Sequence, residues 1–241
     1  MANFQDYLDL AEIVYASKDS GQPNLPGWSI QKWEWATWYG NGYQGGIFEN
    51  ANEIVVAFSG TKGGLTTAPV SQNSGNARIG VNVIPNMAGS AFAMVSWAKQ
   101  NAWNRPISLV GHSLGGGLAQ VVGNWSGLPF ISFNGPGMKS HLKMSAFNIF
   151  KPQQAVRSIR SQNTDDSVGL CFTVKGDFVG EYGYHIGQEV VLTVTSAANK
   201  HSLDAIYTGL QAKGWRPKTP RDVLSTWPAA PSVTRARSRA A

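Results

Sequence analysis

The sequence predicts an α/β fold in which helices cover both faces of a mostly parallel sheet. Short runs of apolar and β-branched residues alternate along the chain with longer segments of helical periodicity, an order typical of parallel sheets. Residues 53–58 form a continuous apolar and β-branched run, as a strand buried on both faces requires, and residues 129–134 are interpreted as another buried strand. A strand, a glycine-rich turn and a helix also follow one another within residues 107–119.

The first part of the chain should supply a helix and the antiparallel edge of the sheet. Residues 4–17 carry apolar side chains near helical spacing and are predicted to form an amphipathic helix. The aromatic-rich residues 32–39 and the residues 43–49 flank Asn41-Gly42, a dipeptide that favours tight hairpin turns. We expect this hairpin at the edge of a mixed sheet.

The middle of the chain should form the centre of the sheet. Residues 53–58 are predicted to be a central strand, and the Gly-, Ser-, Thr- and Asn-rich residues 64–78 a long flexible loop. Residues 86–102 should form a helix that leads into a strand at residues 107–110.

Strands and helices continue to alternate in the second half. We expect strands at residues 129–134, 170–174 and 189–194, and helices at residues 153–160 and 201–210. This order predicts one domain, residues 1–211, large enough to bury a core. Residues 212–241 hold four prolines and an Arg-, Ala- and Ser-rich end, and are predicted to be a poorly ordered basic tail.

The formal charge of the chain lies in this tail. Residues 212–241 carry seven basic residues against one acidic residue, which accounts for the whole net charge of +6, so residues 1–211 are neutral. We therefore expect no nucleic-acid-binding face. Cys171 is the single cysteine, lies in an apolar run, and is interpreted as a buried core thiol without a disulfide. No signal-like or membrane-spanning apolar run is expected.

The residues Gly111-His112-Ser113-Leu114-Gly115 match the G-x-S-x-G nucleophile elbow, in its strand–turn–helix context. The turn should hold Ser113 in a strained conformation that exposes its hydroxyl. The strand and the helix are predicted to cross so closely at Gly111 and Gly115 that a Cβ at either position would collide. The sequence therefore predicts that Ser113 is a catalytic nucleophile.

A serine nucleophile needs a general base, and four histidines are candidates. His201 follows the last predicted strand and begins a helix, at the sheet edge where a base is required, and is favoured. His185 lies between two strands and is the main alternative. His112 should diverge from its neighbour on the sharp turn and pack or hydrogen-bond nearby, and His141 lies in a segment that follows a strand.

The acid that orients the base should fall between Ser113 and His201. Asp177 is favoured because it directly follows a predicted buried strand, where a loop would hold it rigidly. The alternatives are Asp165, Asp166, Glu181 and Glu189.

Two backbone N–H groups are predicted to form an oxyanion hole. One is that of Leu114, the residue after the nucleophile. The other is expected in the turn Ser59-Gly60-Thr61, where Thr61 offers both an N–H and a hydroxyl. The alternative is that Thr61 is an ordinary turn residue.

The chain resembles the class 3 lipases over roughly residues 5–210. Five motifs in matching order carry the resemblance: Val55-Val-Ala-Phe-Ser-Gly-Thr61, Gly111-His-Ser-Leu-Gly-Gly116, Phe133-Asn-Gly-Pro-Gly137, Gly176-Asp-Phe-Val179 and His201-Ser-Leu. Two features depart from the family: Ser59 stands where its members usually have Arg, and the Trp-Asp stretch after that loop is absent.

The resemblance implies an α/β-hydrolase fold and a serine-dependent carboxylic ester hydrolase acting on lipid esters, as a triacylglycerol lipase or a phospholipase A. Ser113 would then be the nucleophile, Asp177 the acid and His201 the base, with Thr61 and Leu114 as oxyanion donors. It implies no metal or organic cofactor, and a lipid ester or membrane surface as partner.

Some bacterial members of this superfamily without signal peptides are phospholipases injected by the type VI secretion apparatus. The expected location is therefore the cytoplasm, or outside the cell through a signal-independent system. A non-catalytic lipid- or protein-binding domain, and a thioesterase or peptidase on the same scaffold, are alternatives. An intact set of Ser113, Asp177 and His201 favours an enzyme.

Two further segments carry hypotheses about lipid contact. Residues 138–150 are interpreted either as a cover of an acyl pocket or as a fixed core helix, because six large apolar side chains lie within thirteen residues. They are Met138, Leu142, Met144, Phe147, Ile149 and Phe150. The basic tail is either a solvated segment or an electrostatic anchor to anionic lipid.

Overall fold

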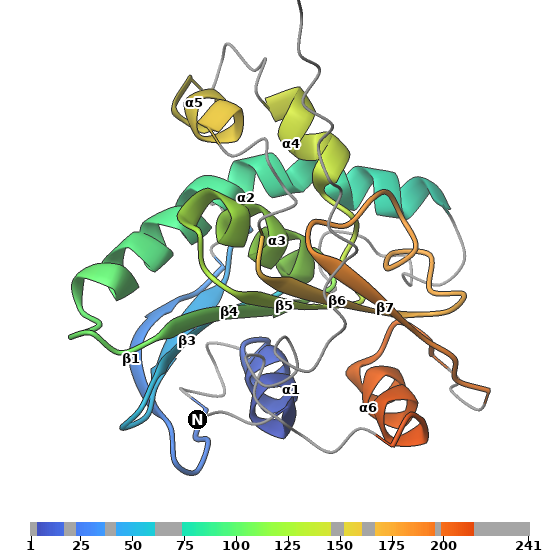
Figure 1. The fold of residues 1–241 in the computed structure, drawn as a ribbon, viewed down its shortest axis with the longest axis horizontal. Coiled ribbons are helices and arrows are strands. Elements are labelled where there is room, and N and C mark those ends of the chain that lie inside the picture. The colour runs from blue at the N-terminus through green and yellow to red at the C-terminus, as the bar shows by residue number, and fades with distance from the viewer. Residues whose placement is uncertain are drawn as a thin grey trace, which may run out of the picture.

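A seven-stranded sheet organises the chain (Figure 1). The computed structural model describes residues 4–16, 23–36, 42–60, 74–145, 152–160, 167–195 and 199–214, with the backbone alone at residues 74–86, 144, 145 and 152. The strands are β1 (Ser29–Glu34), β2 (Gly45–Glu49), β3 (Ile54–Phe58), β4 (Ile107–His112), β5 (Phe130–Phe133), β6 (Gly169–Val174) and β7 (Gln188–Leu192).

The strands lie side by side in the order in which they occur along the chain. β1, β2 and β3 pair antiparallel, whereas β3 to β7 pair parallel. The expected hairpin is therefore the antiparallel edge of a mostly parallel sheet, although its first strand begins at Ser29 rather than at residue 32. The carboxyl ends of β4, β5 and β6 consequently meet at one edge of the sheet.

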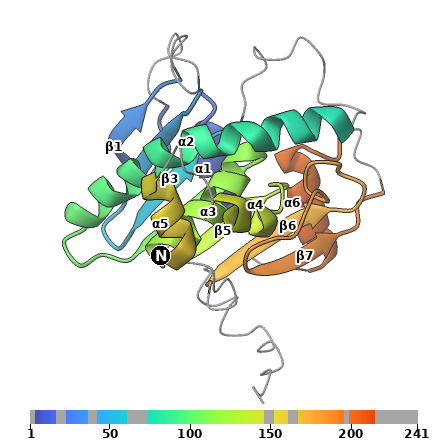
Figure 2. The same cartoon turned by 90° about the horizontal axis from the view of Figure 1, so that it is seen from above.

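Helices cover both faces of the sheet, as Figures 1 and 2 show. One face carries α2 (Ser74–Gln100), α3 (Leu114–Ser126), α4 (Lys139–Ser145) and α5 (Pro152–Arg160). The other face carries α1 (Phe4–Ile13) and α6 (Leu203–Ala212). The predicted fold class, an α/β-hydrolase-type sheet with helices on both sides, is confirmed.

The non-alternating apolar pattern of β3 is explained by its burial on both faces. All five residues of this strand are buried. Val56 and Phe58 pack into the core beneath α2 and α3, whereas Val55 and Ala57 pack into the core beneath α1 and α6. Burial of apolar area on both sides of one strand contributes to both cores at once.

The helix expected at residues 86–102 begins twelve residues earlier, at Ser74, so the prediction of a loop through residue 78 is wrong for residues 74–78. Gly, Asn and Pro85 lower the local helix propensity, and the pattern therefore indicated a loop. A helix already nucleated by its packed part, where Met87 and Met94 are fully buried, extends at little further cost per residue.

Residues 138–150 are only partly described. Met138 and Leu142 are fully buried in the core beneath α2 and α3, which confirms the core interpretation for these two residues. Phe147, Ile149, Phe150 and the side chain of Met144 lie outside the described residues, as do residues 64–73 and the tail from residue 215 onward.

Two further findings concern cysteine and membrane segments. Cys171 is buried, as expected, and its thiol donates to the carbonyl of Ile186 (3.3 Å). Among the described helices, none is both long enough and apolar enough for a bilayer crossing.

Candidate active site

Ser113 occupies the sharp turn between β4 and α3, at the carboxyl edge of the sheet. Its backbone lies at φ 58° and ψ −130°, a conformation that is costly for a residue with a Cβ. The turn is held by hydrogen bonds from Ser113 N to the carbonyl of Phe133 (3.0 Å) and from Gly116 N to the carbonyl of Ser113 (2.9 Å). The predicted strained elbow is therefore present.

The glycines of the elbow are required by contact between backbones. A Cβ at Gly111 would lie 2.2 Å from the carbonyl oxygen of Gly115, and a Cβ at Gly115 would lie 2.1 Å from that of Phe58. Both distances are far below van der Waals contact, so β4, α3 and the end of β3 meet directly here. This packing brings the start of α3 close to the nucleophile.

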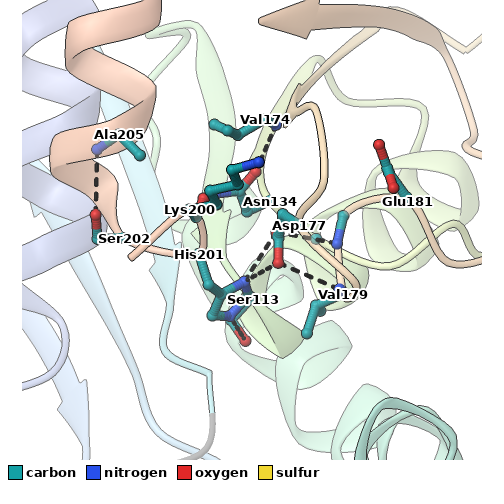
Figure 3. A network of polar contacts seen from close by, with 12 residues as sticks. Ser113, Asn134, Val174, Asp177, Val179, Glu181, Lys200, His201, Ser202 and Ala205 are labelled. Carbon is teal, nitrogen blue, oxygen red and sulfur yellow. Dashed lines mark hydrogen bonds and ion pairs between the residues drawn. The ribbon is translucent and has the colours of Figure 1, made fainter. Parts of the chain in front are cut away.

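His201 connects Ser113 to Asp177 through two sets of hydrogen bonds (Figure 3). Its Nε2 lies 2.9 Å from Ser113 Oγ, and its Nδ1 lies 2.9 Å from Asp177 Oδ2 and 3.0 Å from Oδ1. An imidazole protonated on Nδ1 donates to the carboxylate and leaves Nε2 free to accept the serine proton. The arrangement is that of a nucleophile, a base and an orienting acid.

The Asp177 carboxylate is buried and fixed by its own loop. Its side chain is 3% exposed, against 17% for that of His201. Oδ1 accepts from Val179 N (3.2 Å) and Oδ2 from Gly180 N (3.1 Å), two residues that follow Asp177 in the turn after β6. Each carboxylate oxygen therefore has a backbone donor in addition to the imidazole, which fixes the orientation of the acid.

A family model of Tle-like phospholipase domains matches residues 9–215, which is most of the described chain. The chain belongs to the Tle-like phospholipase family. It is also 32% identical over 103 residues to the extracellular phospholipase A1 of Serratia liquefaciens, a match that covers 42% of this chain and 30% of that protein. The chain therefore spans less than a third of the length of this relative.

Solved lipase structures overlay on this phospholipase-like domain with low sequence identity. The Lip2 lipase of Yarrowia lipolytica gives a TM-score of 0.49 at 16% identity, covering 78% of this chain and 77% of that chain. The lipase of Rhizopus microsporus var. chinensis gives a TM-score of 0.48 at 14% identity, covering 85% and 82%.

The alternative candidates that the structure describes lie elsewhere in the phospholipase-like domain. His185 Nε2–H donates to the carbonyl of Gly135 (3.0 Å), and its Nδ1 lies 3.5 Å from Glu189 Oε1, so this side chain joins the turn after β5 to the segment around the start of β7. Glu181 is exposed and accepts from Gly176 N. His141 lies on α4. Asp165 and Asp166 are outside the described residues.

The structure describes only one of the two residues predicted to form the oxyanion hole. Leu114 is the first residue of α3, and N–H groups in a first helical turn have no acceptor within the helix. The β3 strand leads to Gly60, where a Cβ would lie 2.9 Å from Ser113 Cβ, so this chain segment passes beside the nucleophile. Thr61 itself is outside the described residues, and its role stays a prediction.

His112 lies behind the site and hydrogen-bonds nearby, as expected. Its Nε2 lies 2.6 Å from the carbonyl oxygen of His201, and its Nδ1 lies 3.1 Å from the hydroxyl of Tyr15. Burial, with a smaller contribution from repulsion by His201, lowers the pKa of His112 to about 3. His112 is therefore neutral at ordinary pH, and its Nε2–H can donate to the His201 carbonyl.

Sequence reasoning assigned no role to Tyr15 and Asn134. The Tyr15 hydroxyl accepts from Gly60 N (2.8 Å) and donates toward His112. Asn134 lies within the motif Phe133-Asn-Gly-Pro-Gly137, which carries part of the resemblance to class 3 lipases but does not indicate the contacts of the Asn134 amide. Both side chains reach segments distant in sequence, so no local pattern reports them.

The neutral His112 makes folding stability depend on pH. Because its pKa is about 6.5 in an unfolded chain and about 3 here, only the unfolded state gains the proton between these values. Stability should therefore fall as pH drops below 6.5, by about 2 kcal/mol from this residue at pH 5. His112→Gln should flatten the dependence, measured as the free energy of urea unfolding at pH 7 and pH 5. An unchanged dependence in the variant would assign it to other groups.

Proposed function

We propose that this domain hydrolyses the acyl ester bonds of phospholipids through an acyl-enzyme formed on Ser113. The observation that carries the proposal is the hydrogen-bonded network of Ser113, His201 and Asp177 at the carboxyl edge of the sheet. Membership in the Tle-like phospholipase family supports ester hydrolysis, and the similarity to a protein described as a phospholipase A1 supports a phospholipid substrate.

The first half-reaction transfers the acyl group to the enzyme. Ser113 Oγ attacks the carbonyl carbon of the ester while His201 Nε2 takes the hydroxyl proton. The resulting imidazolium, held at Nδ1 by Asp177, returns that proton to the oxygen of the leaving alcohol. The carbon–oxygen bond then breaks, and a lysophospholipid leaves.

The second half-reaction releases the acyl group to water. His201 Nε2 accepts a proton from water, whose oxygen attacks the acyl carbon, and then returns the proton to Ser113 Oγ as the fatty acid leaves. In both halves negative charge develops on the carbonyl oxygen, and the Leu114 N–H at the start of α3 would donate to it. Asp177 orients the imidazole through its hydrogen bonds to Nδ1 and takes no part in the proton transfer itself.

Fatty-acid release from three substrates tests this function. A diacyl phospholipid, a long-chain triacylglycerol and a dissolved short-chain ester should be compared side by side, with Ser113→Ala as the inactive control. We expect release from the phospholipid and from the short-chain ester, and little from the triacylglycerol. Equal release by the wild-type chain and Ser113→Ala, or none from any substrate, would exclude the proposed hydrolysis.

The surface around the acid loop suits a membrane carrying such substrates. Phe178 and Tyr184, in the β6–β7 segment that bears Asp177, are 57% and 74% exposed. Lys175, three residues before Phe178, and Lys200 are also exposed, and a Cβ at Gly176 would lie 2.7 Å from Lys200 Nζ. Exposed aromatic rings with nearby cations favour the headgroup region of an anionic bilayer.

Removing both rings should weaken binding to anionic vesicles. Phe178→Ser combined with Tyr184→Ser is expected to lower co-sedimentation with vesicles that contain phosphatidylglycerol, and to leave turnover of a dissolved ester unchanged. Trp103→Ser is the matched control, since Trp103 is 88% exposed but precedes β4, at the opposite edge of the sheet. If both variants lose binding equally, exposed aromatic area in general, rather than this surface, contributes the affinity.

A further inference from the structure

The main chain of the base is held by two side chains from the ends of neighbouring strands, the buried Asn134 and the partly buried His112. Asn134 Nδ2 donates to the carbonyl of Lys200 (2.9 Å), which Figure 3 shows beside the triad. His112 Nε2 donates to the carbonyl of His201 (2.6 Å). Two consecutive carbonyls, those of Lys200 and His201, are thus each bound by a side chain that follows or ends a strand of the sheet.

These contacts matter because His201 lies outside regular secondary structure. β7 ends at Leu192 and α6 begins at Leu203, so neither a strand ladder nor a helix fixes the backbone of the base. The imidazole must nevertheless keep both nitrogens within 3.0 Å of their partners. Its position therefore depends on what holds the Lys200–His201 backbone.

Asn134 joins the base segment to the acid segment. Its Oδ1 accepts from Val174 N (2.9 Å), at the end of β6 and three residues before Asp177, while its Nδ2 binds the Lys200 carbonyl. The residue is fully buried and has φ 46°, in the left-handed region that Asn tolerates better than most residues. One amide therefore fixes the separation of the two segments that carry Asp177 and His201.

His112 is itself fixed from behind. Its ring is partly buried and neutral, and the Tyr15 hydroxyl lies 3.1 Å from its Nδ1, which leaves the Nε2–H for the His201 carbonyl. The rings of His112 and His201 also pack with their centroids 4.9 Å apart. A second support, independent of Asn134, thus reaches the base from the β4 side.

We propose that Asn134 and His112 are positioning residues, which hold the Lys200–His201 backbone so that the imidazole spans Asp177 and Ser113. The proposal rests on the proposed hydrolytic function. Neither residue touches the reacting atoms. A displacement of the base by about 1 Å can lower turnover by about 100-fold, so loss of one support should lower kcat without weakening substrate binding.

Asn134→Gly is the sharpest test, because glycine adopts φ 46° without strain and removes only the amide. With a dissolved short-chain ester, kcat should fall about 10- to 100-fold while KM stays unchanged. Asn134→Asp keeps the acceptor for Val174 N but cannot donate to the Lys200 carbonyl, so its kcat should fall by a similar factor. Asn124→Ala is the matched control, because Asn124 Nδ2 binds Ser167 Oγ (2.9 Å) away from the triad.

His112 supplies a second, independent pair of variants. His112→Gln retains an N–H donor for the His201 carbonyl and should keep most of kcat, whereas His112→Leu should not. The melting temperature of every variant is measured in parallel. If kcat is unchanged in both Asn134→Gly and His112→Leu, or falls only where the melting temperature falls below the assay temperature, the positioning role is wrong.

A readout without turnover separates this proposal from the proposed function. The proton of His201 Nδ1 in its hydrogen bond to Asp177 should give a far-downfield proton resonance in the wild-type chain. We expect that resonance to broaden or shift in Asn134→Gly and to persist in Asn124→Ala. A wild-type chain that shows the resonance but hydrolyses no ester would overturn the function alone, whereas an unperturbed resonance in Asn134→Gly would overturn the positioning role alone.

Discussion

Ser113→Ala is expected to lower kcat for ester hydrolysis by about five to six orders of magnitude, and His201→Ala by a similar factor. The reason is that the two side chains act as one unit, joined by the 2.9 Å contact between Oγ and Nε2. Without the base the serine hydroxyl is a weak nucleophile, and without the serine no acyl-enzyme forms. The double variant should therefore be no less active than either single variant.

Asp177→Asn should lower kcat somewhat less, by about four orders of magnitude. The amide can stabilise the wrong imidazole tautomer, but the nucleophile stays in place. The measurement is the initial rate of fatty-acid release at saturating ester, with melting temperatures recorded for each variant. His185→Ala is the informative control, since His185 contacts Gly135 and not the triad. Near-normal activity in His201→Ala, together with loss in His185→Ala, would show that the base is misassigned.

The proximity of the three residues proposed as catalytic could be predicted because each stands at a place that local sequence marks. Ser113 lies in a glycine-flanked turn between an apolar strand and a helix, and Asp177 directly follows the buried strand β6. His201 lies just before the N-cap of α6, Ser202, whose side chain accepts from Ala205 N (3.2 Å). In a parallel sheet such strand-end and helix-start positions gather at one edge, so the pattern also predicts their proximity.

The supports of the base could not be predicted in the same way. Tyr15 reaches His112 across 97 positions of sequence, and Asn134 reaches Lys200 across 66. A buried amide or hydroxyl finds its partner only after the strands have been placed side by side, so no spacing along the chain encodes the contact. The same holds for Gln120, whose buried amide binds Pro136 and Ile186 and so joins the turn after β5 to the segment before β7.

The start of α2 was missed for a different physical reason. Its first turns are rich in Gly and Asn and contain Pro85, which together indicate a loop when local propensity alone is considered. The part of the helix that packs against α3 decides the outcome, since a helix extends cooperatively from a stable segment. Composition therefore predicted the packed half of α2 and not its beginning.

The elbow glycines are the positions where a single methyl group should destabilise the fold most. Gly115→Ala would place a Cβ 2.1 Å from the carbonyl oxygen of Phe58, and neither backbone can move, because α3 is packed against β3 and β4. We expect a loss of about 3–5 kcal/mol in the free energy of unfolding, at the high end of overpacking substitutions. Urea unfolding followed by tryptophan fluorescence measures it.

Gly89→Ala is the matched control, and it should change the free energy of unfolding in the opposite direction. Gly89 is also a helical glycine, on α2, but the atom nearest to a Cβ there is Gln154 Nε2 at 3.5 Å, an ordinary contact. Alanine should therefore stabilise α2 by about 1 kcal/mol, because it restricts the unfolded chain and favours the helix. If the two variants instead change stability equally, helix propensity and not backbone contact determines the effect at Gly115. A loss confined to Gly115→Ala would mean that the close approach of α3 to β3, on which the placement of Ser113 depends, tolerates no side chain.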